Sequence, residues 1–323
     1  MTLFAMYASV GEIATLGCEA TWNQAILGIR GNRQADDRFI RYWLQHLKPR
    51  LAELTNSNTQ DNLNAEIVGN LPFPPTSIDR QRAIADYLDA ETARIDAIID
   101  RRRRMLDLLA ERRSCEVRRA VAGWPEPFPT VALKRRWSVS DCKHRTPAYV
   151  DEGYPVVSPG DVTPGLLDLD RCTRFVDHDD WVDLTDGRRP LEGDIIYSRN
   201  ASIGTASLVV TDRPFCMGQD VCLISSLDQD PRYLTYALNT MGMDQLDEFK
   251  IGSTFNRVNV DRIVDLRVPC PQPSVQRAVA DELDLGGRTY IRQVSSPTRQ
   301  ITLFQERRQA LITAAVTGDL AVP

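Results

Sequence analysis

The residues closest to a catalytic pattern in this chain are Asp230 and the run Glu248-Phe249-Lys250. Carboxylates beside a lysine are a constellation with which a nuclease can bind a divalent metal and polarise a phosphodiester. Residues 232–249 are predicted to be a helix, however, and two positions on a helix that are two residues apart point about 200° away from each other. Glu248 and Lys250 therefore cannot converge on one metal ion, and the pattern does not support a nuclease site.

Other catalytic signatures are absent from the sequence, which has no phosphate-binding P-loop, no G-x-S-x-G elbow and no H-E-x-x-H motif. The three histidines, His46, His144 and His178, lack the spacing of metal ligands. The seven cysteines are odd in number, scattered and without a C-x-x-C pair, which is typical of unpaired thiols in a reducing cytoplasm. We therefore expect no catalytic residue, no metal, no cofactor and a cytoplasmic location.

Three polar stretches of the chain carry many side chains that can donate or accept hydrogen bonds. The first precedes Pro147, the second lies in a predicted turn, and the third follows the predicted helix 232–249.

The elements that must position these side chains occur twice in the chain. The stretch DRQRAIADYLD at residues 79–89 returns as SVQRAVADELD at residues 274–284, an offset of 195 residues. The same offset continues without a gap to residues 120–123 and 315–318, and a proline-rich joint precedes each copy. The repeat is too long for a solenoid. It indicates a duplicated unit in which a globular part is followed by a long helix.

The first helical arm, residues 79–122, contains neither proline nor glycine. Its apolar residues recur at spacings of three, four and seven, which predicts an amphipathic helix of roughly 65 Å, capped by Asp79 and ended by Gly123. The apolar stripe must be buried, most economically against the second copy as a coiled coil. The predicted seam consists of Ile84, Leu88, Ile95, Ile98, Met105 and Leu109.

The second arm departs from the first at Gly286-Gly287 and at Pro297. Because a proline inside a helix removes a hydrogen bond and costs about 3 kcal/mol, we expect a break or kink near Ser296-Pro297. The helix should resume over residues 301–316. The basic run at residues 101–104 is either a solvated helix face or a contact for phosphate or for an acidic partner.

The globular part at residues 124–270 has the pattern of short strands followed by a helix. Residues 195–198 and 206–210 are predicted to be neighbouring strands joined by a turn, and the helix begins after Asp230-Pro231. This favours an α+β domain with a small curled sheet. The counterpart at residues 1–73 matches only its rear half, so the first copy lacks roughly 65–70 residues. Either the domain is truncated or the start codon is placed too late.

Composition sets further limits on the function. The net charge of −5, with 42% hydrophobic and 26% charged residues, is ordinary for about two globular domains. No apolar run reaches the ~18 residues of a membrane span, and no signal-peptide pattern is present. An excess of acidic residues argues against a non-specific coat on nucleic acid, although not against a reader with one local basic face.

The repeated arm resembles a known family. The proline-rich joint, residues 81–89 and Glu111-Arg112-Arg113 look like the conserved arm of the specificity subunit of Type I restriction-modification enzymes. The stretch ERRQALITAAVTGDL at residues 306–320 resembles the closing segment of that family. The stretch GDIIYSRNASIGTASLV at residues 193–209 is similar to its target-recognition domains. The resemblance covers nearly the whole chain.

The resemblance implies an α+β fold with two target-recognition domains, the first one partial, joined by long helices that pair as an antiparallel coiled coil. Each domain would read one half of a bipartite DNA target, and the helices would set the gap between the halves. The resemblance points to the three polar stretches as DNA contacts, because arginine and lysine can bind a phosphate or a guanine, and threonine a phosphate or a thymine methyl group. Each stretch is either such a contact or ordinary loop polarity, and the candidate DNA-binding residues are Lys143, His144, Arg145, Thr146, Arg199, Asn200, Lys250, Ser253, Thr254, Asn256 and Arg257. The subunit would perform no chemistry itself. It would bind double-stranded DNA, methyltransferase (modification) subunits and motor-nuclease (restriction) subunits in phage defence. The implied boundaries are partial domain 1 at 1–73, arm 1 at 74–123, domain 2 at 124–270 and arm 2 at 271–323.

Two other functions remain open at this point. One is a truncated subunit that holds a methyltransferase but reads at most one half-site, and the other is a free-standing enzyme. Sequence-dependent, salt-sensitive DNA binding would separate the complete reader from the truncated subunit. The enzyme hypothesis requires metal-dependent activity of the isolated chain.

Overall fold

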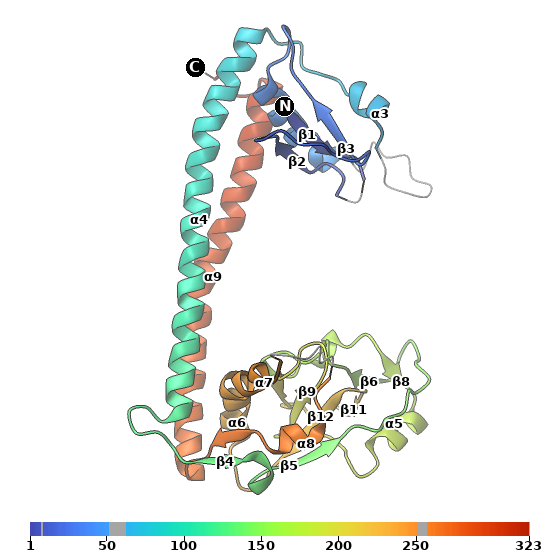
Figure 1. Cartoon of the computed structure of the whole chain (residues 1–323), viewed down its shortest axis with the longest axis vertical. Coiled ribbons are helices and arrows are strands. Elements are labelled where there is room, and N and C mark those ends of the chain that lie inside the picture. Colours follow the sequence, from blue (N-terminus) through green and yellow to red (C-terminus); the bar gives the residue numbers. More distant parts are fainter. Residues whose placement is uncertain (8, 52–62, 251–256, 323) are drawn as a thin grey trace. The chain divides into compact units, whose positions relative to one another are not determined.

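The computed structural model describes residues 1–7, 9–51, 63–250 and 257–322 (Figure 1). The chain forms two compact units, of which unit 1 combines Met1–Leu108 with Gln293–Pro323 and unit 2 is Leu109–Arg292. Two helices of 45 residues, α4 (Ile78–Ala122) and α9 (Pro273–Thr317), contribute to both units. The fold is α+β, as predicted.

Helix α4 confirms the predicted first arm to within one residue at its start. The expected N-cap, Asp79, is wrong, because the helix begins at Ile78 and the Ser77 hydroxyl lies 3.4 Å from the main-chain N–H of Arg80. The far end is the predicted one, since Gly123 has a φ of +76°. A side chain there would collide with the ring of Phe128, which a Cβ atom would approach to 2.7 Å.

Helix α9 is continuous through Pro297, so a break near Ser296-Pro297 is wrong, while a kink there stays a prediction. Proline removes only one main-chain hydrogen bond from the ladder of a long helix, and the side chain of Pro297 is buried. Packing against the rest of the unit outweighs the local propensity, as it commonly does for helices in proteins.

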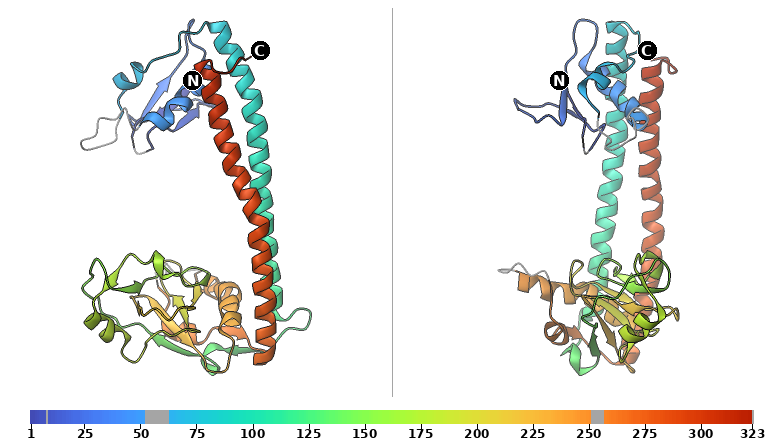
Figure 2. Two further views of the ribbon diagram at one scale, coloured as in Figure 1. Left: turned by 180° about the vertical axis from the view of Figure 1, so that it is seen from behind. Right: turned by 90° about the vertical axis from the view of Figure 1, so that its right-hand side faces the viewer.

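The two long helices pair in an antiparallel manner, and Figure 2 shows them side by side from two directions. In unit 1, Ile84 and Leu88 near the start of α4 belong to one apolar core with Ile312 near the end of α9. In unit 2, Val121 near the end of α4 shares a core with Leu283 near the start of α9. Each unit therefore contains the beginning of one helix and the end of the other.

The predicted seam is correct in its first half. Ile84, Leu88 and Ile95 are 4%, 0% and 6% exposed. Ile98 is half-buried, whereas its neighbour Ile99 is only 4% exposed and was not predicted. The true seam position is therefore Ile99.

Met105 is wrong as a seam residue, because it is 41% exposed. Buried and half-buried positions recur at alternating intervals of three and four residues, the period of a coiled coil. That period runs from Ile95 through Ile99, Arg102 and Leu106 to the predicted Leu109, and the half-buried Arg113 continues it. The seam residue is therefore Leu106, one position after the predicted Met105, and Arg102 is a seam position that the apolar pattern of the sequence did not include.

The globular part of unit 1 is a small antiparallel sheet covered by a helix. The described strands have the order β2-β1-β3, and α1 is capped by the carboxylate of Asp36, which accepts from the main-chain N–H of Arg38 and Phe39. Its core includes Phe4, Phe39 and residues of both long helices. The elements are β1 (Thr2–Ala5), β2 (Ile13–Thr15), β3 (Ile26–Ile29), α1 (Asp37–Leu47), a 3-10 turn (Lys48–Arg50) and α3 (Ala65–Gly69).

The globular part of unit 2 is larger, with a five-stranded sheet in the order β5-β12-β9-β10-β7, a three-stranded sheet in the order β11-β6-β8 and the pair β13-β4 among the described residues. Its strands are β4 (Thr130–Ala132), β5 (Ser138–Asp141), β6 (Tyr154–Val157), β7 (Gly165–Leu166), β8 (Phe175–Val176), β9 (Ile195–Ser198), β10 (Ala206–Leu208), β11 (Cys216–Met217), β12 (Val221–Ser225) and β13 (Arg267–Pro269). Its helical elements are α5 (His178–Thr185), α6 (Pro231–Ala237), α7 (Met243–Lys250) and α8 (Val260–Val264), with 3-10 turns at Leu133–Arg135 and Leu169–Arg171.

The local predictions for this part hold, with one refinement. Strands β9 and β10 form the expected antiparallel pair. The helix predicted over residues 232–249 does begin after Asp230, whose carboxylate accepts from the N–H of Arg232 and Tyr233. It consists of α6 and α7, however, joined by a π-helical turn at Leu238–Gly242.

The joint between globular part and arm is built twice from the same residue types. Gln81 of α4 is 1% exposed and its side chain accepts from the N–H of Asp36 at 2.9 Å. Its repeat counterpart, Gln276 of α9, is 0% exposed and accepts from the N–H of Asp230 at 3.0 Å. Each glutamine amide also donates to main-chain carbonyls or to a second glutamine nearby. The duplication seen in the sequence is therefore a duplication of the docking contact.

Ion pairs repeat beside each glutamine. Arg38 of α1 pairs with Asp86 and Asp89 at 2.7 and 3.0 Å in unit 1. In unit 2, Arg232 of α6 contacts Asp281 and Asp284 at 2.8 and 2.9 Å. Helix α1 in unit 1 and helix α6 in unit 2 are therefore held on their arms by the same charge pattern.

Candidate nucleic-acid interface

The predicted DNA-binding stretches of unit 2 meet at one end of the strands of the five-stranded sheet, where β5 and β9 end and β12 begins. We call this end of the strands the sheet edge. Strand β5 ends at Asp141, which pairs with Cys222 of β12, and β9 ends at Ser198, which pairs with Val221 of the same strand. The chain therefore leaves β5 and β9 at the same edge, where β12 begins. This places residues 142–146 and 199–200 next to each other, although more than 50 residues separate them in the sequence.

The third stretch reaches the same edge through Arg257. Its guanidinium Nη2 lies 3.4 Å from Nδ1 of His144, and its Nε lies 2.7 Å from a carboxylate oxygen of Asp220. Asn200 donates to the other oxygen of Asp220 at 3.1 Å and forms a β-bridge with Arg257. All three predicted stretches thus meet around one aspartate.

Asp220 is the residue of this network that the sequence reasoning missed. It has a φ of +66°, and its main-chain carbonyl accepts from the N–H of Arg199 at 2.8 Å. The repeat offered a partial signal, since Met217-Gly218-Gln219, directly before Asp220, falls near the counterpart of Trp22-Asn23-Gln24 in the first copy. Gln219 donates to the hydroxyl of Thr146 at 2.9 Å, which fixes the end of the first predicted stretch.

Arg199 is wrong as a surface contact for DNA, because only 2% of its side chain is exposed. Its guanidinium is ion-paired with Asp141, and Nε2 of His144 lies 3.1 Å from the same carboxylate. Burial alone would raise the pKa of Asp141, but the hydrogen bond and charge of Arg199, with a smaller contribution from His144, hold it below the ordinary value. Arg199 therefore anchors the end of β5 and, through Asp141, orients His144.

Lys143 and Arg145 face helix α5. Lys143 Nζ lies 2.6 Å from one oxygen of Asp183, and the Arg145 guanidinium lies 3.0 Å from the other. Arg145 also pairs with Asp180. The hydrogen bond from Lys143, then its charge and that of Arg145, lower the pKa of Asp183. Both predicted cations are thus neutralised within the protein.

The remaining predicted residues belong to the third stretch. Ser253, Thr254 and Asn256 lie outside the described residues. Lys250 is the last residue of α7, and its side chain is likewise outside the description. Arg257 is the first residue described after this gap, and its side chain is 41% exposed.

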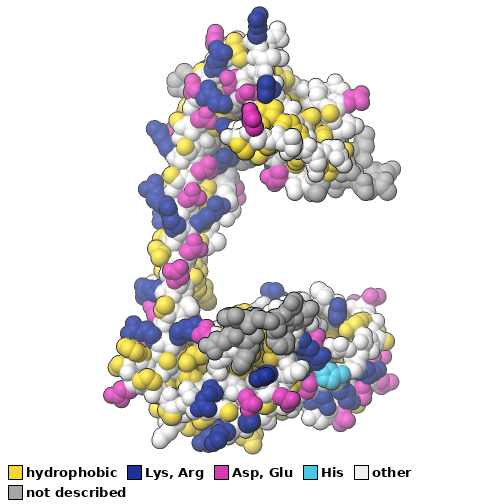
Figure 3. Space-filling model, in the orientation of Figure 1, with side chains coloured by type: hydrophobic (Ala, Val, Ile, Leu, Met, Phe, Trp, Pro, Cys, Tyr) yellow, Lys and Arg dark blue, Asp and Glu magenta, His cyan; other side chains and the backbone are white. Residues whose placement is uncertain are grey.

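The network lines a polar cavity of about 410 Å³. Arg257, His144 and Asn259, the residue just ahead of α8, are among the residues that line it. Its lining is not uniformly basic, because Asp141 and Asp261 belong to it as well. Figure 3 shows the same mixture of Lys and Arg with Asp and Glu over the visible face of each unit. Donors and acceptors, rather than a broad positive field, characterise this edge.

Residues with catalytic potential have structural roles in the described part of the chain. Asp230 caps α6 and pairs with Arg232 at 3.0 Å. No group of three or more His, Cys, Asp or Glu side chains among the described residues is arranged to hold a metal ion. All seven cysteines lie in described segments and are free thiols, four of them buried.

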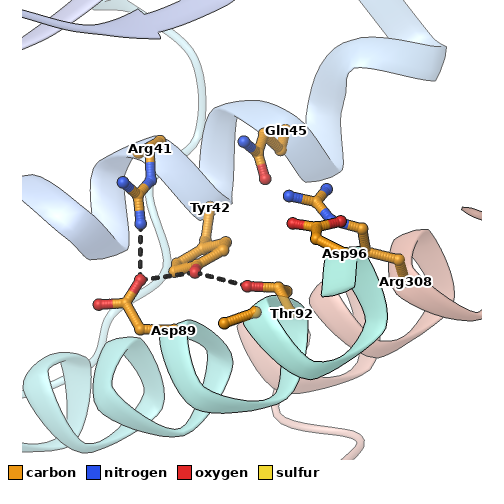
Figure 4. A pocket seen from close by; sticks show the side chains of 8 residues that line it. Arg41, Tyr42, Gln45, Asp89, Thr92, Asp96 and Arg308 are labelled. Atoms are coloured by element: carbon orange, nitrogen blue, oxygen red, sulfur yellow. Dashed lines mark hydrogen bonds and ion pairs between the residues drawn. The ribbon is translucent and has the colours of Figure 1, made fainter. Parts of the chain in front are cut away.

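A second polar cavity, of about 250 Å³, lies in unit 1 where α1 meets both long helices (Figure 4). Arg41 Nη2 lies 2.7 Å from Asp89, and the Tyr42 hydroxyl donates to the same carboxylate at 2.6 Å. Arg308 of α9 pairs with Asp96 of α4 at 3.0 Å. Its two cations and two anions are paired with each other, so the cavity belongs to the docking contact and not to a charged ligand site.

The repeat counterpart of Arg308 is Arg113, and it uses a different partner. In unit 2, Arg113 Nη2 donates to the main-chain carbonyl of Leu283 at 2.6 Å and its guanidinium lies over Gly286. In unit 1, the equivalent carbonyl, that of Leu88, accepts from the hydroxyl of Thr92 at 2.7 Å. The glycine pair in α9, unexplained by the sequence alone, thus makes room for an arginine.

The sequence was compared with models of known protein families, and one family matches most of the chain. The sequence model of the family described as "Type I restriction modification DNA specificity domain" matches residues 2–104 and 143–291. Among the described residues, no helix is both long enough and apolar enough to cross a membrane.

Three solved structures are similar over 99% of this chain. The first, described as "Structural basis underlying complex assembly and conformational transition of the type I R-M system", has 18% sequence identity, a TM-score of 0.65 and 82% of its own length covered. The S subunit of a Type-I restriction-modification system from M. genitalium has 15% identity, 83% coverage and a TM-score of 0.47. The HsdS subunit from Thermoanaerobacter tengcongensis has 16% identity, 81% coverage and a TM-score of 0.49. The first of these likenesses shows a shared fold.

Proposed function

Because this chain belongs to the Type I restriction modification DNA specificity domain family, whose members are non-catalytic specificity subunits, we propose that it reads the DNA target of a Type I restriction-modification complex. The observation that carries the proposal is the convergence of the predicted DNA-binding stretches on one sheet edge of unit 2. Spacing in the sequence does not require these stretches to meet. A reader of base edges does require it, because several donors must reach one groove together.

Within this edge, Arg257 is the side chain best suited to a base. Its guanidinium is exposed, and Asp220 and His144 hold it in one orientation, so little freedom is lost on binding. Arginine is the common bidentate partner of guanine in the major groove. We assign Lys143 and Arg145 to the phosphate backbone, which positions a reader without specifying sequence. Asn200 and Thr146 support the same loop ends.

The repeated joint supports two readers on one frame. Gln81 with Arg38 and Gln276 with Arg232 attach a globular part to the long helices in the same manner. Under the proposal, each globular part reads one half of a bipartite target and the paired helices set the gap between the halves. The chain would also hold methyltransferase and restriction subunits. A scaffold that reads one half-site through unit 2 is the alternative.

The test is co-expression of the chain with the methyltransferase subunit of its own system, followed by single-molecule sequencing of methylated bases in the host DNA. A bipartite motif that disappears without this chain supports two working readers. A single or palindromic half-site supports reading by unit 2 alone. A stable complex without methylation would overturn the proposal that this chain reads DNA.

A residue-level version compares two exposed arginines, each ion-paired with an aspartate. Arg257→Gln should weaken binding to the identified target by about 1–3 kcal/mol and relax the choice of one base. Arg213→Gln removes the same charge from unit 2, from a side chain that is 47% exposed and paired with Asp170 at 3.0 Å. Equal effects of the two changes would contradict the assignment of Arg257 as a base contact.

A further inference from the structure

The ion pairs of Lys143 and Arg145 with helix α5 would compete with DNA phosphates if this edge binds DNA. Resting on the function proposed above, we propose that Asp180 and Asp183 of α5 are internal substitutes for DNA phosphates, which hold Lys143 and Arg145 until a correctly placed backbone displaces them. The two carboxylates would thereby determine specificity, by lowering the affinity for DNA that lacks the target.

The geometry is that of an anion site occupied by the protein's own carboxylates. Lys143 Nζ and the Arg145 guanidinium lie 2.6 and 3.0 Å from the two oxygens of Asp183. Arg145 also contacts Asp180, and the main-chain N–H of Ala148 donates to Asp180 at 3.1 Å. An ammonium, a guanidinium and a main-chain N–H are the donors that proteins direct at phosphate oxygens. Here all three already have an acceptor.

The exposure of these groups makes exchange with DNA feasible. The side chains of Arg145 and Asp183 are 47% and 45% exposed, whereas that of Asp180 is 13% exposed. Exposed ion pairs contribute little stability, so a phosphate can replace Asp183 without a large loss. Asp180 is held more firmly, because it also accepts from the N–H of Ala148. The first step of exchange would therefore be at Asp183.

The consequence appears in the salt dependence of binding. Each phosphate that a protein neutralises makes the slope of log affinity against log salt more negative by about 0.9, which is about a 3.5-fold loss of affinity between 50 and 200 mM. With Lys143 and Arg145 paired internally, weakly placed DNA gains little from either. The chain's excess of acidic residues, with a net charge of −5, fits a reader that limits non-specific contacts.

The experiment measures binding of the full-length chain, in one assembly state for every variant, to a duplex without the target at 50 and 200 mM salt. Asp183→Asn and Asp180→Asn keep an oxygen acceptor and remove the charge. We expect each change to make the slope of log affinity against log salt more negative by about 0.9. The affinity at 50 mM should rise about threefold or more. Asp179→Asn is the matched control, because Asp179 is exposed on the same helix and is in none of these pairs.

The outcomes separate this inference from the proposed function. If Lys143→Gln with Arg145→Gln weakens binding while Asp183→Asn and Asp180→Asn behave like Asp179→Asn, the basic pair contacts DNA but the carboxylates do not restrain it, and the inference is wrong. If the double change leaves binding and slope unaltered, the basic pair does not contact phosphate, and both the inference and that part of the proposed function are wrong. Adding the double change to Asp183→Asn should abolish the gain.

Discussion

The contact between Arg113 and the glycine pair of α9 leads to a prediction in which two neighbouring substitutions have opposite signs. Replacing glycine by alanine inside a helix ordinarily stabilises it by about 0.8–1 kcal/mol. A Cβ atom at Gly287 would lie 3.5 Å from Arg113, an ordinary contact, so Gly287→Ala should show that gain. A Cβ atom at Gly286 would lie 2.6 Å from Arg113 Nη1, closer than atoms can approach.

Gly286→Ala therefore requires the end of the Arg113 side chain to move, and we expect this movement to break the hydrogen bond from Arg113 to the Leu283 carbonyl. A hydrogen bond from a charged group contributes about 1.5–3 kcal/mol, which exceeds the helical gain. We expect Gly286→Ala to destabilise unit 2 by about 0.5–2 kcal/mol, so that the two variants differ by about 1.5–3 kcal/mol.

The assay is amide hydrogen exchange of α9, read by mass spectrometry, because it reports the local opening free energy without assuming that both units unfold together. In an Arg113→Met background the constraint is gone, and Gly286→Ala should then stabilise the helix as Gly287→Ala does. The reasoning is refuted if the two alanine variants protect α9 equally in the parent protein, or if the Arg113→Met background leaves their difference unchanged.

Three further outcomes follow from the buried contacts. Gln276→Leu leaves the partners of three buried hydrogen bonds unsatisfied and should destabilise unit 2 by about 2–5 kcal/mol in urea unfolding. An unchanged midpoint would contradict a stabilising role for the Gln276 hydrogen bonds. Leu88→Ala should cost about 2–5 kcal/mol while Met105→Ala costs under about 0.5, and a similar loss for both would restore Met105 to the seam. Burial, and then the charge of Arg50, lower the pKa of His46, so the folded state favours neutral imidazole. The contribution of His46 to the free energy of unfolding is therefore fully present above pH ~6.5, and it should be lost as the pH falls through the pKa of the folded state. His46→Gln should remove this pH dependence from the midpoint of thermal unfolding measured between pH 7 and 5.

The sequence predicted best where local chemistry decides. Helix α4 ends at Gly123 because a glycine there adopts a positive φ, and α6 begins after Asp230 because a carboxylate followed by proline is a strong N-terminal signal. The repeat went further, since it predicted that the two joints would be alike. Pro297 misled the prediction because proline acts on one hydrogen bond, whereas packing along the whole of α9 decides whether the helix continues.

The sequence pointed to the polar stretches that meet at this sheet edge, but not to the ion pairs that their side chains form. Arg199 was expected on the surface because it follows a strand in a polar turn, and nothing in its neighbourhood reveals that its partner is Asp141, 58 residues earlier. Lys143 and Arg145 were expected to contact phosphate or guanine, and the sequence does not show that their partners in the fold are aspartates of α5. The residue types show which side chains are polar, while only the fold shows which of them form ion pairs with each other.

The composition of unit 1 from both ends of the chain bears on how the protein is made. Phe4 and Leu44 share their core with Ile312 and Val316, which leave the ribosome only after residues 109–292 have been synthesised. At about 5–20 residues per second, the early segments wait about 10–40 s for their partners. Unit 2, which is continuous in the sequence, can fold during that interval. The nascent chain would then carry one folded unit and one exposed apolar face, a species that chaperones should bind until residues 293–316 have emerged.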